Sequence, residues 1–207
     1  GHESGMAPDG KTFYSAAPST SSLTAIDISN PELPIPIAVS PIFSHGLSLS
    51  DDGNRAYVAS VSVTGAADES TKKGLLILDT SEVQARKINP SMPIIAHLTW
   101  EPISTPQNAI PFTIKGHPYL VEIDEFGAGK AVGAGRIIDI GDDTQPKIIS
   151  NLRLEVHNPE NFEAIKDDPA AASGVQGYAA HYCNVPQRKD PTIVACSMIL
   201  SGLRVFD

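Results

Sequence analysis

Residues 44–80 read SHGLSLSDDGNRAYVASVSVTGAADESTKKGLLILDT and constrain the fold more than any other part of the chain. Two runs of alternating apolar and polar residues, 45–50 and 55–60, flank the turn sequence Asp-Asp-Gly. Because Asp tolerates turn conformations and Gly adopts a positive φ without a Cβ clash, these runs predict a β-hairpin. A third run at 74–79 predicts one further strand.

The same pattern occurs four times along the chain. Its hairpin turn recurs as PDGK, SDDGN, IKGHP and QRKDP, at residues 8–11, 50–54, 114–118 and 187–191. Its third strand ends in aspartate each time, at Asp27, Asp79, Asp139 and Asp207. Candidates for an outer strand follow the first three copies, as IPIAVS, MPIIAHLTW and PKIISNLRLEV. The repeats therefore cover residues 1–43, 44–102, 103–156 and 178–207, with an insertion at 157–177.

Repeated antiparallel hairpins of this kind predict an all-β fold, an antiparallel β-propeller in which each repeat is one blade. The chain starts at an innermost strand and stops after a third strand, which leaves the outer edge of the last repeat unpaired. Since such edges are normally covered, we expect about four blades of a larger ring of roughly 6 to 8. The alternative is a four-bladed ring with one frayed blade.

Composition narrows the function classes. Of the 207 residues, 41% are apolar, and 17 Pro with 16 Gly divide the chain into short segments, as in all-β proteins. The formal net charge of −9 means that the chain lacks the excess of positive charge that nucleic-acid-binding proteins use. No apolar run reaches the roughly 18 residues of a membrane-spanning helix. We therefore expect a soluble chain whose partner is not a nucleic acid.

The ends of the repeats resemble a known group of propellers. LTAIDISNPELP, GLLILDTS, GRIIDIGDDTQP and SGLRVFD are similar to the LVIVD-repeat proteins and to the neighbouring YVTN-type propellers of bacteria and archaea. Asp27 with Asn30 and Pro31 matches the family pattern best, and the turns after Asp79 and Asp139 are looser versions. The resemblance implies a propeller that is often exported. It implies no particular activity.

The long connections are expected to gather at one mouth of the propeller. The insertion 157–177 joins an outer strand to the next inner strand, and the loops at 61–73 and 125–134 join second strands to third strands. All three leave from the same end of the blades, where we also expect residues 101–108 and Trp100. We expect the side chain of Trp100 to pack within a blade. Loops of this kind usually carry the binding or catalytic residues.

Glu122, Asp124 and Glu125 fall close together at the end of a predicted strand. Strand alternation places Glu122 and Asp124 on one face, and the sequence identifies no partner for them. A solvated edge is therefore the expected role of this group, and paired-carboxylate catalysis is not favoured.

The two cysteines, Cys183 and Cys196, flank the last hairpin. Antiparallel pairing around a turn near residues 188–189 places them opposite each other or nearly so, within the range of a disulfide. We therefore expect a disulfide, which favours an exported protein. Two buried free thiols are the alternative.

Alignment of the four hairpin turns places a polar residue at the first position of each innermost strand. These residues are His2, His45, Asn108 (Gln107 after a slip of one residue) and His181. Hydrogen bonding to the backbone of the neighbouring blade is the main interpretation. The alternative is convergence at the mouth of the channel, where imidazoles hold zinc, copper or iron.

These features predict an exported propeller that acts as a binding or scaffold module for a small molecule or a protein partner. The alternative is an enzyme whose active site lies at the loop-lined mouth of the channel, with a metal held by histidines. The sequence does not identify a catalytic residue, a substrate or a ligand.

Overall fold

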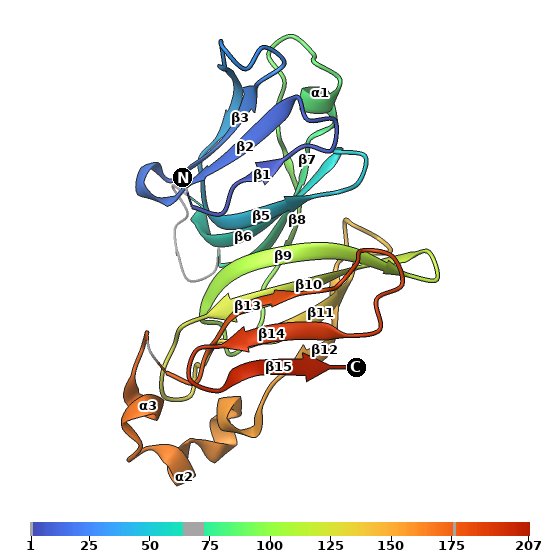
Figure 1. Ribbon diagram of the computed structural model, residues 1–207. Helices are drawn as coiled ribbons and strands as arrows, with labels where there is room; N and C mark the ends of the chain where they lie inside the picture. The colour runs from blue at the N-terminus through green and yellow to red at the C-terminus, as the bar shows by residue number, and fades with distance from the viewer. Residues whose placement is uncertain (1, 64–72, 176) are drawn as a thin grey trace. The chain divides into compact units, whose positions relative to one another are not determined.

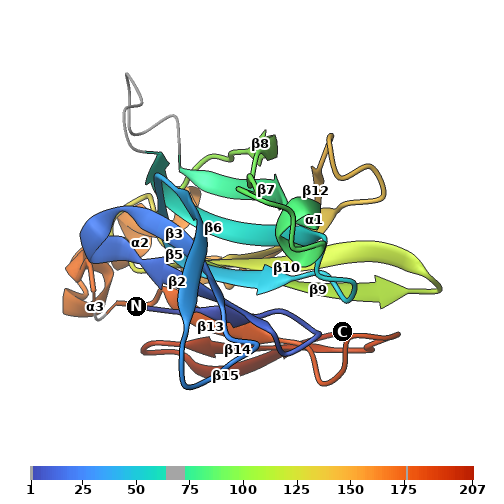
Figure 2. The same ribbon diagram turned by 90° about the horizontal axis from the view of Figure 1, so that it is seen from above.

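The computed structural model describes residues 2–63, 73–175 and 177–207. In these residues the strands form four antiparallel sheets, each built from strands that follow one another in the sequence (Figures 1 and 2). Three of the sheets have four strands and one has three. The predicted all-β fold is therefore confirmed. Residues 64–72, within the loop expected at 61–73, lie outside the described residues.

The chain divides into two compact units, unit 1 (Gly1–Thr99) and unit 2 (Trp100–Asp207). Unit 1 holds two sheets. The first consists of β1 (Gly5–Met6), β2 (Thr12–Ala17), β3 (Ser22–Asp27) and β4 (Ile35–Ser40). The second consists of β5 (Ile42–Leu49), β6 (Arg55–Val63), β7 (Gly74–Asp79) and β8 (Ile94–Leu98). Unit 2 holds the other two sheets. One consists of β9 (Thr105–Ile114), β10 (His117–Glu125), β11 (Gly135–Asp139) and β12 (Lys147–Leu152). The other consists of β13 (Ala180–Asn184), β14 (Val194–Met198) and β15 (Gly202–Phe206).

The described helices are short and lie in the connections. They are η1 (Pro18–Thr20) and α1 (Ser81–Gln84) in unit 1, and η3 (Glu155–His157), η4 (Pro159–Asn161), α2 (Phe162–Ile165) and α3 (Pro169–Ala172) in unit 2. At the start of α3 the Asp168 side chain accepts a hydrogen bond from Ala170 N at 2.9 Å and caps the helix. No helix in the described ranges is long and apolar enough to cross a membrane.

The hairpin turns form for the reason expected from their residues. Gly10, Gly53 and Gly116 have φ angles of 68°, 73° and 81°, in the left-handed region that glycine enters at no steric cost. The fourth turn uses Asp190 with φ 48°, a conformation that Asp tolerates better than most residues.

The aspartates at the ends of the third strands close a local turn. β3, β7 and β11 end at Asp27, Asp79 and Asp139, as predicted. Each carboxylate Oδ1 accepts a hydrogen bond from the backbone N–H two residues further on: Asp27 from Ser29 (2.8 Å), Asp79 from Ser81 (2.9 Å) and Asp139 from Gly141 (2.8 Å). Hydrogen bonds from the side chains of Ser29 and Ser81, and then from their backbone N–H groups, lower the pKa of Asp27 and Asp79, and the Gly141 N–H lowers the pKa of Asp139. The repeated aspartate is therefore a turn-closing residue.

Replacement of Asp79 by alanine is expected to lower the free energy of unfolding by about 1 kcal/mol, because the Ser81 N–H loses its acceptor. Asp79→Asn keeps an acceptor oxygen and should lose less. The lowered pKa of Asp79 stabilises the fold above the ordinary carboxyl pKa of about 4, and this stabilisation disappears as the pH falls further. Urea unfolding of the two variants measures the difference. Equal losses for both would contradict a role for the oxygen.

Each unit has its own apolar core. In unit 1 the strands β2, β3, β5 and β7 contribute buried side chains that include Tyr14, Leu23, Ile42, Leu76 and Leu78. In unit 2 one face of the β9–β12 sheet packs against the β13–β15 sheet (Figure 2). The residues at this contact include Val121, Ile123, Cys183, Cys196 and Met198.

Candidate functional site

The two long connections of unit 2 meet at one end of its sheets. Gly127 N donates to Gly174 O at 3.0 Å, and Gly129 N donates to Ala171 O at 3.3 Å. These bonds join the glycine-rich loop after β10 to the insertion that precedes β13, and α2 and α3 lie at this end in Figure 1. For unit 2 these bonds confirm the prediction that the connections 125–134 and 157–177 lie together at one end of the blades.

A glycine is required where the loop passes over the end of β10. A Cβ atom built on Gly133 would lie 2.5 Å from Asp124 O and 2.8 Å from the carbonyl of Glu125. Ala180 N donates to Gly133 O at 2.9 Å, which attaches the start of β13 to the same loop. The close backbone approach thus brings the end of β10 and the start of β13 together.

The expectation that Glu122, Asp124 and Glu125 form a solvated edge is wrong. These residues are 0%, 1% and 2% exposed. The physical reason is Arg136 on β11, which is paired in register with Glu122 and is itself buried. A buried cation next to these carboxylates offsets the cost of removing them from water.

Arg136 links two carboxylates and an aromatic ring. Its Nη1 donates to Glu122 Oε2, and its Nη2 donates to Asp124 Oδ2 at 3.1 Å. The same Asp124 oxygen accepts from Trp100 Nε1 at 2.8 Å, and the Arg136 guanidinium lies 4.0 Å from the centre of the Trp100 ring. Trp100 is buried, so its expected packing role is confirmed. We call Glu122, Asp124, Arg136 and Trp100 the charge cluster.

Arg136 carries its charge at neutral pH. Burial, and then the positive charge of Arg153, lower the pKa of the guanidinium. Because the ordinary value lies above about 12 and two carboxylates contact the cation, the protonated form persists. The cluster thus holds two acidic groups against one cation. Among the residues that the structure describes, none forms a hydrogen bond with the Glu122 Oε1 atom.

Beside the charge cluster, an exposed histidine contacts a buried carboxylate. His181 Nε2 lies 3.2 Å from Glu125 Oε2, and their side chains are 55% and 2% exposed. The ring of Phe126 stacks on the imidazole with centroids 6.4 Å apart. In the neutral ring Nε2 donates to the carboxylate, which leaves Nδ1 as an acceptor. We call His181, Glu125 and Phe126 the histidine site.

Backbone register explains how His181 reaches the surface. Ala180 pairs with Met198 and Tyr182 pairs with Ser197, so His181 is an extra residue in a β-bulge. Bulges commonly redirect a side chain at the rim of a sheet. Sequence alternation could not show this, because a bulge interrupts the alternation.

The four polar residues aligned in the sequence do not stand at the first positions of their strands. His45 is the fourth residue of β5, Asn108 the fourth of β9, and His181 the second of β13, while His2 precedes β1. The strands β5, β9 and β13 begin earlier in the sequence than expected, because β-bulges near these polar residues let the strand pairing continue past them. In β9 the residue skipped by the register is Gln107, since Asn108 pairs with Ile123 and Pro106 with Asp124. The structure therefore favours the one-residue slip.

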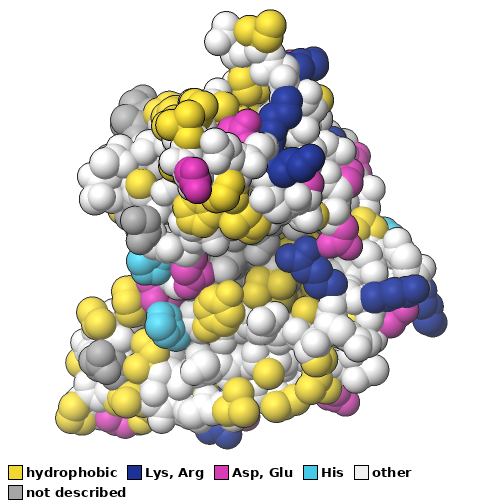
Figure 3. Space-filling model, turned by 45° about the horizontal axis from the view of Figure 1, so that its top comes forward, with side chains coloured by type: hydrophobic (Ala, Val, Ile, Leu, Met, Phe, Trp, Pro, Cys, Tyr) yellow, Lys and Arg dark blue, Asp and Glu magenta, His cyan; other side chains and the backbone are white. Residues whose placement is uncertain are grey.

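The four residues divide between the two units. In unit 1 the rings of His2 and His45 have centroids 4.4 Å apart, and His2 Nδ1 lies 3.2 Å from His45 O. In unit 2 Asn108 Nδ2 donates to Tyr182 OH at 3.2 Å. Histidine side chains reach the surface next to acidic and apolar ones (Figure 3). Among the described residues no group of three or more His, Cys, Asp or Glu is arranged to hold a metal. Metal binding by the four residues stays a prediction.

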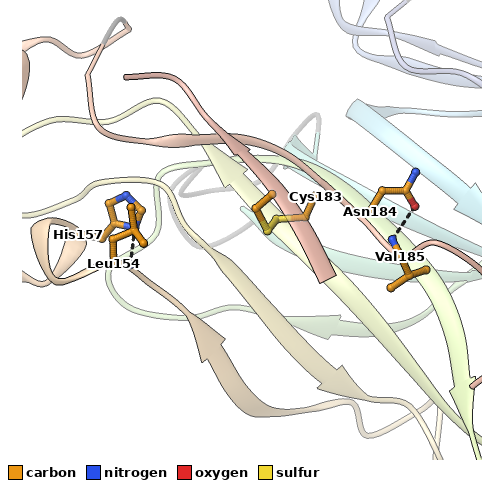
Figure 4. The surroundings of a disulfide bond; sticks show 6 residues. Leu154, His157, Cys183, Asn184 and Val185 are labelled. Carbon is orange, nitrogen blue, oxygen red and sulfur yellow. Dashed lines mark hydrogen bonds between the residues drawn. A yellow bond between two sulfur atoms is a disulfide. The ribbon is translucent and has the colours of Figure 1, made fainter. Parts of the chain in front are cut away.

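The predicted disulfide is confirmed. Cys183 and Cys196 are directly paired on β13 and β14, with Cα atoms 4.0 Å apart, and their sulfurs are bonded (Figure 4). Both cysteines are buried in the core between the two sheets of unit 2. The bridge therefore holds β13, which carries His181, to the rest of its sheet.

Comparisons with known proteins identify the architecture. No protein family and no curated protein matches the sequence. Hydrazine synthase from Kuenenia stuttgartiensis superposes with a TM-score of 0.60 at 16% identity, over 95% of this chain and 43% of that chain. A TolB-type protein from Agrobacterium tumefaciens superposes with a TM-score of 0.51 at 10% identity, over 99% of this chain and 56% of that chain. The chain has a β-propeller fold. It spans about half the length of these two propellers, and at these identities the similarity concerns the fold alone.

Proposed function

We propose that the chain is an exported propeller module of the LVIVD-repeat or YVTN type that binds its ligand at the histidine site of unit 2. The main support for this proposal is the exposed imidazole of His181, which contacts the almost completely buried carboxylate of Glu125. Burying a carboxylate is costly in free energy, so its position behind a surface histidine indicates that the orientation of the ring matters. The adjoining long loops are where propellers and other rigid scaffolds carry binding residues.

The proposed location outside the cytoplasm rests on the disulfide. Disulfides persist in oxidising compartments and are rare in the cytosol. The Cys183–Cys196 bridge therefore supports a periplasmic, cell-surface or secreted protein. The acidic balance of the chain argues against nucleic acid as its partner.

The histidine site favours ligands with a hydrogen-bond donor next to an apolar surface. Nδ1 of His181 accepts a hydrogen bond when Nε2 donates to Glu125. The Phe126 ring next to it provides apolar contact area. Hydroxyl and amide groups on a small organic ligand or on a peptide from a protein partner both meet these requirements.

The same pair of residues supports an enzyme as the second candidate function. In a general base, one ring nitrogen removes a proton from water or from a hydroxyl group while a carboxylate holds the other. His181 with Glu125 has this arrangement. This candidate differs from the first in requiring turnover, which would depend on both residues.

Fragment binding followed by NMR tests the proposal. We expect hydroxyl- and amide-bearing aromatic fragments to shift the backbone amide signals of residues 125–127 and 180–182. Affinity should fall about tenfold in His181→Ala, as expected for loss of one good hydrogen bond. Glu125→Gln should weaken binding as well, because the ring loses its charged partner.

The matched control is His97→Ala, since His97 belongs to unit 1, is also exposed, and has its Nε2 3.1 Å from the backbone oxygen of Lys73. Its affinity should equal that of the parent protein. Fragments that shift signals elsewhere, or that bind His181→Ala as tightly as the parent, would contradict the proposed site. Hydrolysis of a bound fragment that is lost in both His181→Ala and Glu125→Gln would favour the enzyme.

A further inference from the structure

His157 ties together the two ends of the insertion between β12 and β13. Its Nδ1 accepts a hydrogen bond from Leu154 N at 3.2 Å, as Figure 4 shows. Its Nε2 lies 2.8 Å from Tyr178 O, and since a carbonyl only accepts, Nε2 carries the proton. Leu154 follows β12 by two residues and Tyr178 precedes β13 by two. The neutral ring therefore closes the base of the segment 154–178, in which residue 176 lies outside the described residues.

The ring is buried, with 1% of the residue exposed, and both of its nitrogens are used. A second proton would have to bind at Nδ1, where the Leu154 N–H already points. Two donors would then face each other without an acceptor, in a place that water does not reach. Protonation of His157 thus requires the contact to open.

The charged groups near the ring do not compensate for a positive imidazole. Arg153 Nη1 donates to the backbone oxygen of His157 at 3.2 Å, which places another cation beside it. Glu155 and Glu160 of the same insertion are exposed. The contacts to Leu154 and Tyr178 are made with uncharged backbone. Burial first, and then Arg153, lower the pKa of His157.

We propose that His157 is an acid-sensitive latch that keeps the segment 154–178 closed in its neutral form and releases it on protonation. Other hydrogen bonds of the segment include Tyr178 OH to Asp168 Oδ2 at 2.6 Å and the two glycine bonds to the loop after β10. That loop carries Phe126. Opening of the segment would therefore disturb Phe126 and ligand binding at the histidine site. This effect on the ligand rests on the proposed function, whereas the latch itself does not.

The direction of the pH dependence follows from proton linkage. The open segment exposes a histidine with an ordinary pKa near 6.5, whereas the closed segment binds the proton less readily. The open form thus takes up more protons as the pH falls below about 6.5, and closure is fully stabilised above that value. At about pH 5 the opening equilibrium rises by up to about 30-fold.

Hydrogen–deuterium exchange measures this opening directly. Exchange rates are corrected for the intrinsic effect of pH and compared at about pH 7.5 and about pH 5. In the parent protein we expect protection of peptides from residues 154–178 to fall by about 10- to 30-fold at the lower pH. Peptides from β9, β10 and β11 should keep their protection.

His157→Gln is the decisive variant, because its amide can accept from Leu154 N and donate to Tyr178 O without titrating. We expect similar protection of the segment at both pH values in this variant. His117→Gln replaces an exposed histidine that contacts Asp139 and should respond as the parent does. Equal loss of protection in the parent and in His157→Gln would overturn the latch. So would unchanged protection in the parent at the lower pH, whatever the variants show.

A binding measurement separates the latch from the ligand site. If the latch opens as expected while fragments bind His181→Ala and the parent equally, the proposed function fails and the latch stands. If fragments bind at the histidine site while the segment keeps its protection at the lower pH, the latch fails and the site stands.

Discussion

Replacement of Arg136 by methionine is expected to lower the free energy of unfolding by about 3–5 kcal/mol, the largest effect of any single substitution considered for this chain. Arg136 is the cation between Glu122 and Asp124, and all three residues are almost completely buried. Methionine fills similar space but leaves two carboxylates without their cation. Urea unfolding followed by far-ultraviolet circular dichroism measures the loss.

Two further variants identify the cause of that loss. Arg204→Met removes an exposed arginine on β15 and should change the free energy of unfolding by less than about 0.5 kcal/mol. The triple variant Glu122→Gln, Asp124→Asn, Arg136→Met removes all three charges and should recover part of the lost stability. A loss below about 1 kcal/mol for Arg136→Met alone would show that the carboxylates do not depend on the cation.

Removal of the disulfide is expected to cost about 3 kcal/mol. Cys183 and Cys196 are 13 residues apart in sequence, and a bridge that closes a loop of about 15 residues limits the unfolded chain by roughly this amount. The variant to compare with the parent is Cys183→Ala with Cys196→Ala, measured by thermal or urea unfolding. Reduction of the parent under unfolding conditions should lower its stability towards that of the double variant.

Reductant provides the control for this prediction, since it should leave the unfolding curve of the double variant unchanged. Mass spectrometry of alkylated, unreduced protein tests the bridge independently. Two alkylated cysteines in the native parent would show that the bridge is absent. Its loss should also loosen β13 and thereby weaken fragment binding at His181, which lies two residues before Cys183.

Much of the fold follows from short stretches of sequence. The hairpins depend on residues such as Gly53, whose positive φ is a property of the turn itself. The ends of the third strands depend on aspartates such as Asp79, which bond to a residue two positions away. The disulfide was predictable because its cysteines flank one hairpin, so that a short and regular register brings them together.

The charge cluster could not be predicted in this way. Glu122 and Asp124 read as exposed because acidic residues are rarely buried without a partner. Their partner, Arg136, lies on the next strand beyond a glycine-rich loop, and neither its register with Glu122 nor its stacking on Trp100 leaves a local signal. A charged residue inside a predicted apolar strand, such as Arg136 in GRIID, is the one available clue.

The bulges were the other obstacle. A sequence alignment counts residues, whereas a bulge adds one residue to one strand without adding one to its partner. Asn108 and Gln107 were therefore interchangeable in the alignment, and only the pairing of Asn108 with Ile123 separates them. The same effect hid the outward direction of His181.

The turn-closing aspartates make the propeller suitable as a display scaffold. In unit 2 the bond from Gly141 to Asp139 secures the end of β11 within three residues, independently of any long connection. The glycine-rich loop and the segment 154–178 leave from the opposite end of the sheets. New peptide sequence introduced at that end would be presented by strands whose other end stays closed. Randomised libraries for binder selection therefore belong in these two connections, with Gly133 and His157 kept.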